Sequence, residues 1–430
     1  MAITGRAVAL AALGLIPVLL VPEPTTIGVW MLLWVLLLGL DLLLAASPRA
    51  LTITRAPIAA LRMTESTASV LTVANDGRRR LRGLIRDAWQ PSAGAVQNRH
   101  RIDLRPDEAR RFTTGLTPGR RGDLLADRVT VRARGPLGLA ARQFSTPVPG
   151  FLRVLPEFRS RRHLPSRLAR LREMDGRSAV NVRGPGTEFD SLREYVIGDD
   201  VRAIDWRASA RRNEVVVRTW RPERDRRVFI VLDSSRLSAA RLGEEPRLDA
   251  GIEASLLLTA LATRAGDRVE LIAVDQSVRA RVSGTQSATV MSSLAAALAP
   301  VHPQLVEPDW TLVAQLIADR LSQRALVVLV SGLEAGVLES GLLPVAAALA
   351  ADHQVVLASA TDPGAEELRR ARHDSTELFD AAAVERASLE RRGLGLELRR
   401  TGVEVLERLP DELAPALADT YLALKAAGRL

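Results

Sequence analysis

The chain lacks cysteine, has one lysine, and draws only 3% of its residues from the aromatic types. Without cysteine, no disulfide can staple any part of it and no thiolate can act as nucleophile or metal ligand. Because Lys425 is the single lysine, the net charge of +9 is carried almost wholly by arginine. Clustered cations bind nucleic acid by displacing counterions from phosphates, but no platform of interleaved basic and aromatic residues accompanies them here. We therefore expect no specific nucleic-acid partner, and an arginine-rich surface solvated near an anionic membrane leaflet.

Recognised catalytic motifs are also missing. The sequence contains no Walker A loop, no H-E-x-x-H and no G-x-S-x-G. Its five histidines lack the spacing of metal ligands or of a catalytic triad: His100, His163, His302, His353 and His373. Nothing in the motif content therefore indicates an enzyme, although residues that are scattered in sequence can still converge in the fold.

Long apolar runs are confined to the first 48 residues, which we predict to form a transmembrane helical hairpin. Residues 27–46 hold twenty consecutive residues with a single charge, which as a helix span the roughly 30 Å hydrocarbon core. Residues 7–21 are shorter and contain Pro17, but with Arg6 snorkelling they can also cross. The expected architecture is a multi-pass protein of the cell membrane with two spans.

Charge around these spans predicts the orientation. The connecting segment 22–26 carries Glu23 and no cation, whereas arginines flank the other ends of both spans: Arg6 before the first, and Arg49, Arg55 and Arg62 after the second. The positive-inside rule then places both ends, and the soluble body, in the cytoplasm. A cleaved signal peptide is the competing interpretation, but no small-x-small cleavage site follows the first run.

Asp41 lies within the second predicted span. A carboxylate at the bilayer centre costs roughly 2.5–3.5 kcal/mol on insertion scales, so an intramembrane acid is a functional candidate by default. Because Asp41 is close to the cytoplasmic end of the span, we expect it to reach lipid headgroups or Arg49 and to have no functional role.

Residues 49–156 change to short runs of period two, such as TASVLTVAN at 67–75 and DRVTVRARG at 127–135, separated by Gly, Pro and Asn turns. Alternating strands with regular turns predict an antiparallel β-sandwich. It contains no catalytic constellation, so we expect a supporting or recognition role.

Residues 157–224 form a basic connector followed by a distinctive block. Residues 157–185 are rich in arginine and favour a solvated linker helix, with a helix on the membrane surface as the alternative. The block GTEFDSLREYVIGDDVRAIDWRASARRNEVVVRTW at 186–220 resembles the defining segment of a bacterial family called domain of unknown function 58. The matching residues are Gly186, Glu188, Phe189, Arg193, Glu194, Tyr195, Gly198, Asp199, Asp200, Arg202, Asp205, Trp206, Ala210 and Arg211.

Two interpretations of this block remain open, a structural clamp and a partner surface. Asp199 and Asp200 suit a turn followed by a helix N-cap, after which Ile204 and Trp206 would pack inward. Fork-like bonds are expected between guanidiniums and carboxylates, with Arg193, Arg202, Arg207 and Arg211 as donors and Glu188, Glu194 and Asp205 as acceptors.

Residues 225–430 alternate continuous Val/Ile/Leu strands with helical stretches, which predicts a mostly parallel, doubly wound α/β sheet covered on both faces. Such sheets bind ligands at the carboxyl ends of their strands. The family resemblance implies the same architecture as a whole: a membrane hairpin, a sandwich and a C-terminal von Willebrand A-like domain. PLGL at 136–139 resembles the family's sandwich exit, with Gly135 where an acid is usual.

The first strand of this domain ends in Asp233-Ser234-Ser235-Arg236-Leu237, which resembles the D-x-S-x-S start of a von Willebrand A metal site. The candidate ligands are Asp233, Ser235 and Thr311, hard oxygen donors that suit Mg²⁺ or Mn²⁺. The resemblance also implies two departures, Leu237 for the second serine and Gly332 for an acid. A degenerate, metal-free domain is therefore expected.

We accordingly expect a membrane-anchored interaction or assembly factor. The resemblance implies a partner among MoxR-type AAA+ ATPases, docked by the degenerate von Willebrand A-like domain. The alternative is a metal-dependent hydrolase in which Asp233 is a metal ligand and a nearby acid is the base.

Overall fold

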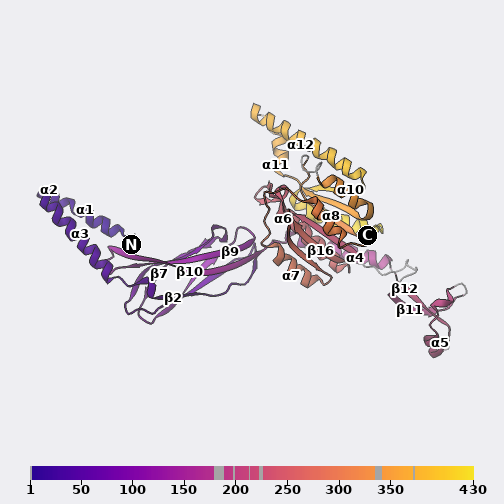
Figure 1. The fold of residues 1–430 in the computed structure, drawn as a ribbon, viewed down its shortest axis with the longest axis horizontal. Helices are drawn as coiled ribbons and strands as arrows, with labels where there is room; N and C mark the ends of the chain where they lie inside the picture. The colour runs from indigo at the N-terminus through magenta and orange to yellow at the C-terminus, as the bar shows by residue number, and fades with distance from the viewer. Residues whose placement is uncertain are drawn as a thin grey trace. The chain divides into compact units, whose positions relative to one another are not determined.

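The computed structural model describes residues 2–178, 188–196, 199–212, 214–221, 226–334, 341–370 and 373–430. The chain divides into two compact units, Met1–Glu157 and Phe158–Leu430 (Figure 1). The first unit contains the apolar helices and the β-rich region, and the second contains the α/β sheet. Each unit has its own buried core, so each is considered by itself.

Among the described residues, one helix is long and apolar enough to cross a membrane, by length and composition. Helix α3, Pro24–Leu44, has 21 residues and is therefore about 31 Å long. Large apolar side chains such as Leu32, Leu36 and Leu43 are exposed along it. The apolar N-terminal helix predicted at 27–46 is confirmed. The run predicted at 7–21 forms two shorter helices, α1 at Gly5–Leu13 and α2 at Leu15–Leu20.

Helices α1 and α2 lie against α3. The indole nitrogen of Trp34 donates to the Ala7 carbonyl at 2.9 Å. Gly14 separates α1 from α2, and a β-carbon there would collide with the ring of Trp30. Strand β1, Ala2–Ile3, precedes α1 and pairs with Ala140 and Ala141 of the sandwich. The residues before α1 and those at the end of α3 therefore contact the same sandwich.

Asp41 has a different role from the one expected near the lipid headgroups. It is fully buried, and its carboxylate accepts N–H bonds at 2.7 Å from Leu137, Leu139 and Ala140, at the loop before β10. A side chain at Gly135 would collide with this carboxylate. The acid that the family resemblance places at 135 is thus missing, and a carboxylate from α3 fills the same space. Asp41 ties the helix end to the sandwich.

Two β-sheets share one core in the first unit. The first contains β1 Ala2–Ile3, β3 Leu61–Arg62, β5 Leu81–Trp89, β7 Arg99–Leu104, β9 Gly122–Arg134 and β10 Ala140–Leu155. The second contains β2 Leu51–Arg55, β4 Thr67–Asn75, β6 Ala95–Val96 and β8 Ala109–Leu116. Leu71 and Phe112 of the second sheet pack with Ile85 and Val131 of the first. The predicted β-rich region is confirmed, and its alternating pattern reflects one buried face per sheet.

Arg55 is buried inside this sandwich rather than free at the membrane surface. Its guanidinium donates to both carboxylate oxygens of Asp87, at 2.9 and 2.7 Å. Trp89 adds an indole N–H bond to the same carboxylate at 3.0 Å. Because this cation is paired inside the sandwich, its guanidinium does not contact lipid headgroups in the folded chain.

The second unit is built on a six-stranded sheet in the order β17-β16-β13-β18-β19-β20, with only β17 antiparallel. Its strands are β13 Arg227–Asp233, β16 Arg268–Val274, β17 Val278–Gly284, β18 Leu326–Val330, β19 Gln354–Ala360 and β20 Glu404–Arg408. This order is doubly wound, so the α/β prediction is confirmed. From β13 the chain adds β16 and β17 on one side and then β18, β19 and β20 on the other, so the direction of strand addition reverses between β13 and β18. Ligand sites are expected at such a switch point.

Helices cover both faces of this sheet. Side chains alternate along β13, with Ile230 facing one core and Phe229 the other. The first core is covered by α6 Arg247–Arg264, α7 Ser287–Leu298 and α13 Pro410–Ala426. The second is covered by α8 Trp310–Ala318, α10 Leu343–Asp352 and α12 Ser375–Arg400. The remaining short elements are α11 Gly364–Arg370, β14 Arg241–Leu242 and β15 Glu245–Pro246.

Helix α4, Leu164–Ser178, belongs to this unit and is not the solvated linker that its arginines favoured. Leu164 and Leu171 are buried in the first core, on a stripe with helical spacing. Arg167 donates to Asp419 of α13 at 2.6 Å. The arginine content concealed a narrow apolar face, which is enough to dock one helix.

Candidate functional site

The predicted metal ligand Asp233 lies at the carboxyl end of β13, beside the point where strand order reverses. It is 1% exposed. One carboxylate oxygen accepts the Ser235 N–H at 2.8 Å, and the other accepts the Ser331 hydroxyl at 2.6 Å. Burial raises the pKa of Asp233, against the opposing effect of these hydrogen bonds. Asp233 is therefore more easily protonated in the folded chain than a solvent-exposed aspartate.

A guanidinium covers this acid where the family resemblance implies a second carboxylate. Arg247, at the start of α6, donates to the Leu237 carbonyl at 2.6 Å and to Glu334 at 2.9 Å. A β-carbon at Gly332 would collide with the Arg247 guanidinium. The glycine at 332 thus makes room for a cation, and a cation at this position repels a divalent metal ion.

The other two candidate ligands do not join Asp233. The Ser235 hydroxyl accepts the Leu237 N–H at 3.4 Å, as the N-cap of a short 3₁₀ helix, Arg236–Ala239. Thr311 is exposed on α8, and none of the described residues links its side chain to the Asp233 cluster by a hydrogen bond. Within the described residues no three His, Asp or Glu side chains converge as metal ligands. The expectation of a metal-free domain stays a prediction.

Asp275, at the end of the neighbouring strand β16, is also a buried acid, but its pKa is shifted in the opposite direction. Burial alone would raise its pKa, but the Arg279 guanidinium at 2.6 Å and backbone N–H donors outweigh burial and lower it. The Ser234 hydroxyl donates to the same carboxylate at 3.3 Å. The pKa values of the acids at two adjacent strand ends are therefore shifted in opposite directions.

The family block forms a small antiparallel unit. Strands β11, Glu188–Glu194, and β12, Val216–Arg221, pair and enclose the 3₁₀ helix Val201–Ala203 and helix α5, Trp206–Arg212. Gly186 and Gly198 lie outside the described residues, as does the side chain of Glu188.

A bidentate ion pair fixes the turn after β11. Arg193 donates to both oxygens of Asp199, at 2.8 and 2.6 Å, and Asp199 also accepts the Val196 N–H at 2.9 Å. The Arg193 guanidinium holds the pKa of Asp199 below its usual range. Arg193 was predicted as a donor to a glutamate or to Asp205, and its partner is instead Asp199, six residues along the chain.

Asp200 and Asp205 both cap helices. Asp200 accepts the Arg202 N–H at 2.9 Å, as predicted for an N-cap. Asp205 accepts the Ala208 N–H at 3.0 Å and the Arg218 guanidinium at 2.9 Å. Arg218 was absent from the predicted clamp. The remaining predicted side chains, which are at least partly exposed, make no ion pair with another described residue: Glu194, Tyr195, Arg202, Arg207 and Arg211.

Trp206 does not pack inward as predicted, since it is 69% exposed. The inner face of α5 is occupied by Ser209, whose hydroxyl accepts the Val216 N–H at 3.0 Å. Trp206 is the first residue of α5, and its side chain is exposed although Ser209, three residues later, is buried. Val196 and Val201, each 61% exposed, add apolar area in the same block.

Comparison with known families matches residues 191–393 to the family described as protein of unknown function DUF58. The predicted family is confirmed. The match includes most of the family block and continues through the α/β sheet to α12. DUF58 is defined by sequence and carries no assigned activity in its description, so function must be argued from the site itself.

Curated relatives come from mycobacteria. The uncharacterized proteins Rv1480 of Mycobacterium tuberculosis and Mb1516 of Mycobacterium bovis are each 28% identical over 186 residues, which is 42% of this chain. The matched segment is 57% of the length of either relative. Neither name states an activity.

Two of the solved structures that the chain resembles each cover a little under half of it. BatB of Bacteroides thetaiotaomicron is 14% identical with a TM-score of 0.30, covering 46% of this chain and 98% of that one. The VWA domain of SpRpn10 is 11% identical with a TM-score of 0.28, covering 45% and 94%. Likeness at this level says nothing about shared function.

Proposed function

We propose that the protein is a membrane-anchored docking factor, with two spans and a cytoplasmic body. The exposed apolar surface of α3 needs a hydrocarbon environment, because so large an apolar area is costly in water. Pairing of β1 with β10, and the bonds from Asp41 to the same region, support a return of the chain to its starting side. The arginines outside the apolar runs, together with Glu23 between them, favour the cytoplasmic side.

The observation that carries the docking proposal is the exposed Trp206 on a rigid frame. A tryptophan in water exposes a large apolar surface, and interface hot spots are enriched in this residue. Bonds from Arg193 to Asp199 and from Arg218 to Asp205 hold the segments on either side of Trp206. Such a frame lowers the conformational entropy that a partner must overcome on binding.

The partner we propose is a MoxR-type AAA+ ATPase, the class that the family resemblance implies. It would contact the family block and the von Willebrand A-like domain that follows. The exposed arginines beside the tryptophan, Arg202 and Arg207, would favour an acidic rim on that partner. No observation favours the hydrolase alternative, because both oxygens of Asp233 already accept hydrogen bonds and Arg247 lies over the strand end.

The test is co-purification of the full chain with the AAA+ ATPase from detergent-solubilised membranes, followed by a titration with purified components. Trp206→Ala should weaken binding by roughly 30-fold or more, the range of an interface hot spot. Phe379→Ala is the matched control, since Phe379 on α12 is an exposed aromatic residue outside the block. Equal affinity of wild type and Trp206→Ala would refute the tryptophan as the contact, and absence of any AAA+ partner would refute the proposed class.

A further inference from the structure

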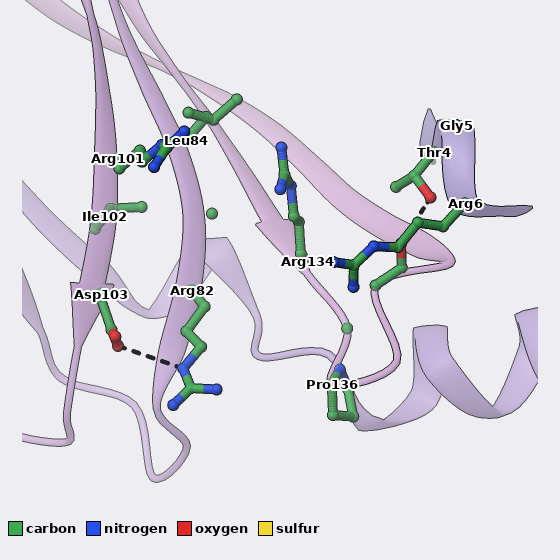
Figure 2. Close-up of a pocket in the computed structure, with 13 residues that line it drawn as sticks. Thr4, Gly5, Arg6, Arg82, Leu84, Arg101, Ile102, Asp103, Arg134 and Pro136 are labelled. Atoms are coloured by element: carbon green, nitrogen blue, oxygen red, sulfur yellow. Dashed lines mark hydrogen bonds and ion pairs between the residues drawn. The ribbon is translucent and has the colours of Figure 1, made fainter.

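A cavity of about 730 Å³ lies where the apolar helices join the sandwich. The start of α1, strands β5 and β7, and the loop that Asp41 holds contribute its walls (Figure 2). Thr4, at the entrance to α1, donates its hydroxyl to the Gly138 carbonyl at 2.6 Å, which fixes the helix start against that loop. The cavity is thus built from elements that are held together independently of any ligand.

Four guanidiniums line this cavity, those of Arg6, Arg82, Arg101 and Arg134. Figure 2 shows Arg6 and Arg134 on the loop side and Arg82 and Arg101 on the strands opposite. The lining contains one carboxylate, Asp103.

The Asp103 carboxylate is already ion-paired with an arginine. Arg80 donates to both of its oxygens, at 2.6 and 2.7 Å, and thereby holds the pKa of Asp103 below its usual range. Arg82 is 3.6 Å from the same group. Among the described residues, no carboxylate pairs with Arg6, Arg101 or Arg134. The cavity therefore carries a positive charge that the described chain does not neutralise.

The location of the cavity indicates the source of an anion. Asp41 lies near the end of α3 and Arg6 near the start of α1, and both border the loop at 135–138. If the two helical segments cross the bilayer, this level coincides with the lipid headgroups. Basic cavities at this depth on the cytoplasmic side recognise anionic headgroups.

We propose that this cavity binds the phosphate group of an anionic phospholipid headgroup. Guanidiniums suit the task because their planar donors form paired hydrogen bonds with phosphate oxygens. The inference rests on the proposed membrane anchoring. It assigns a ligand to the basic cavity at the junction between helix and sandwich.

The experiment is native mass spectrometry of the full chain in detergent, titrated separately with phosphatidylglycerol, phosphatidylcholine and inorganic phosphate. Arg101→Gln/Arg134→Gln should weaken phosphatidylglycerol binding by about tenfold, since two of the four cations are removed. Both side chains are exposed, so the fold should persist. The matched control is Arg86→Gln/Arg99→Gln, which removes two exposed cations that face each other on β5 and β7 outside the cavity lining.

Weaker phosphatidylglycerol binding in Arg101→Gln/Arg134→Gln, with binding retained in the control double variant, supports the site. Equal loss in both double variants, or equal binding of phosphatidylcholine, overturns it. Phosphate that competes with phosphatidylglycerol at equal concentration would overturn the lipid as the source of the anion. Alkaline carbonate extraction of membranes separates the two proposals: a chain that resists extraction but binds no phosphatidylglycerol is anchored and lacks the site.

Discussion

Asp41 and Asp233 are both buried aspartates at the end of an apolar element, yet their surroundings differ. Asp41, in the first unit, accepts three backbone N–H bonds from a loop 96 to 99 residues further along the chain. Asp233, in the second, accepts one N–H from its own loop and one hydroxyl from Ser331 of the adjacent strand end. Three backbone donors make Asp41 a structural link between elements. At Asp233 the donors are fewer, and burial raises the pKa of the carboxyl group.

The largest effect that separates the two acids is expected from Asp41→Ala. Removal of this carboxylate leaves three N–H groups without their acceptor, and each buried unsatisfied group costs ~1–3 kcal/mol. The sum is several kcal/mol, a large part of a domain's stability. Thermal unfolding of the full chain in detergent, combined with hydrogen exchange of the Leu139 and Ala140 amides, measures it.

Asp127→Ala is the matched control, because Asp127 is an exposed sandwich acid paired only with its neighbour Arg128. A surface change of this kind alters stability by about 0.5 kcal/mol or less. Unchanged exchange at Leu139 and Ala140 in the Asp41→Ala chain would show that the carboxylate does not hold the loop.

Asp233→Asn should have a smaller effect that depends on pH. The pKa of Asp233 is raised by burial, so the folded chain binds this proton more tightly than the unfolded chain. Its stabilising contribution is present at acid pH and is lost as pH rises through the folded pKa. Each pKa unit of difference corresponds to about 1.4 kcal/mol.

Asparagine cannot ionise, so the variant should gain stability relative to wild type between acid and neutral pH. Denaturant unfolding of the second unit within the full chain, followed across that range, provides the measurement. A constant difference at all pH values would mean that folding does not change the pKa of Asp233.

The smallest effect is expected from Asp199→Asn, whose pH dependence should run opposite to that of Asp233→Asn. This carboxylate is paired with Arg193, which lowers its pKa, so its contribution is present above the usual aspartate range and is lost as pH falls through the folded pKa. The sign is opposite to that of Asp233. Exchange of the Val196 amide should be faster in the variant at neutral pH and should converge with wild type in acid.

Arg193→Gln removes the same ion pair from the other side, and should reproduce the neutral-pH behaviour of Asp199→Asn. If the hydrogen-exchange rate of the Val196 amide is unchanged in both variants, the ion pair does not hold this amide in place.

Periodicity predicted the elements well. The Val/Ile/Leu strands predicted within residues 225–430 are observed as β13, β16, β18 and β19 of one sheet. The edge strand β20, Glu404–Arg408, was not predicted, because its sequence EVLER is short and mostly charged. Helix α4 was misjudged for a related reason, since composition averages over a helix while docking needs only one face.

The sequence by itself determined the apolar anchor, the alternating sandwich strands and the parallel α/β sheet, because each follows from local periodicity and the burial of apolar side chains. Only the tertiary structure decided the partners of the charges. Asp41 meets a distant loop, Arg247 lies against Gly332, and Trp206 is exposed while Ser209 of the same helix is buried. A charged side chain takes whichever partner the packed elements bring within hydrogen-bond distance, and that choice depends on contacts that no local pattern encodes.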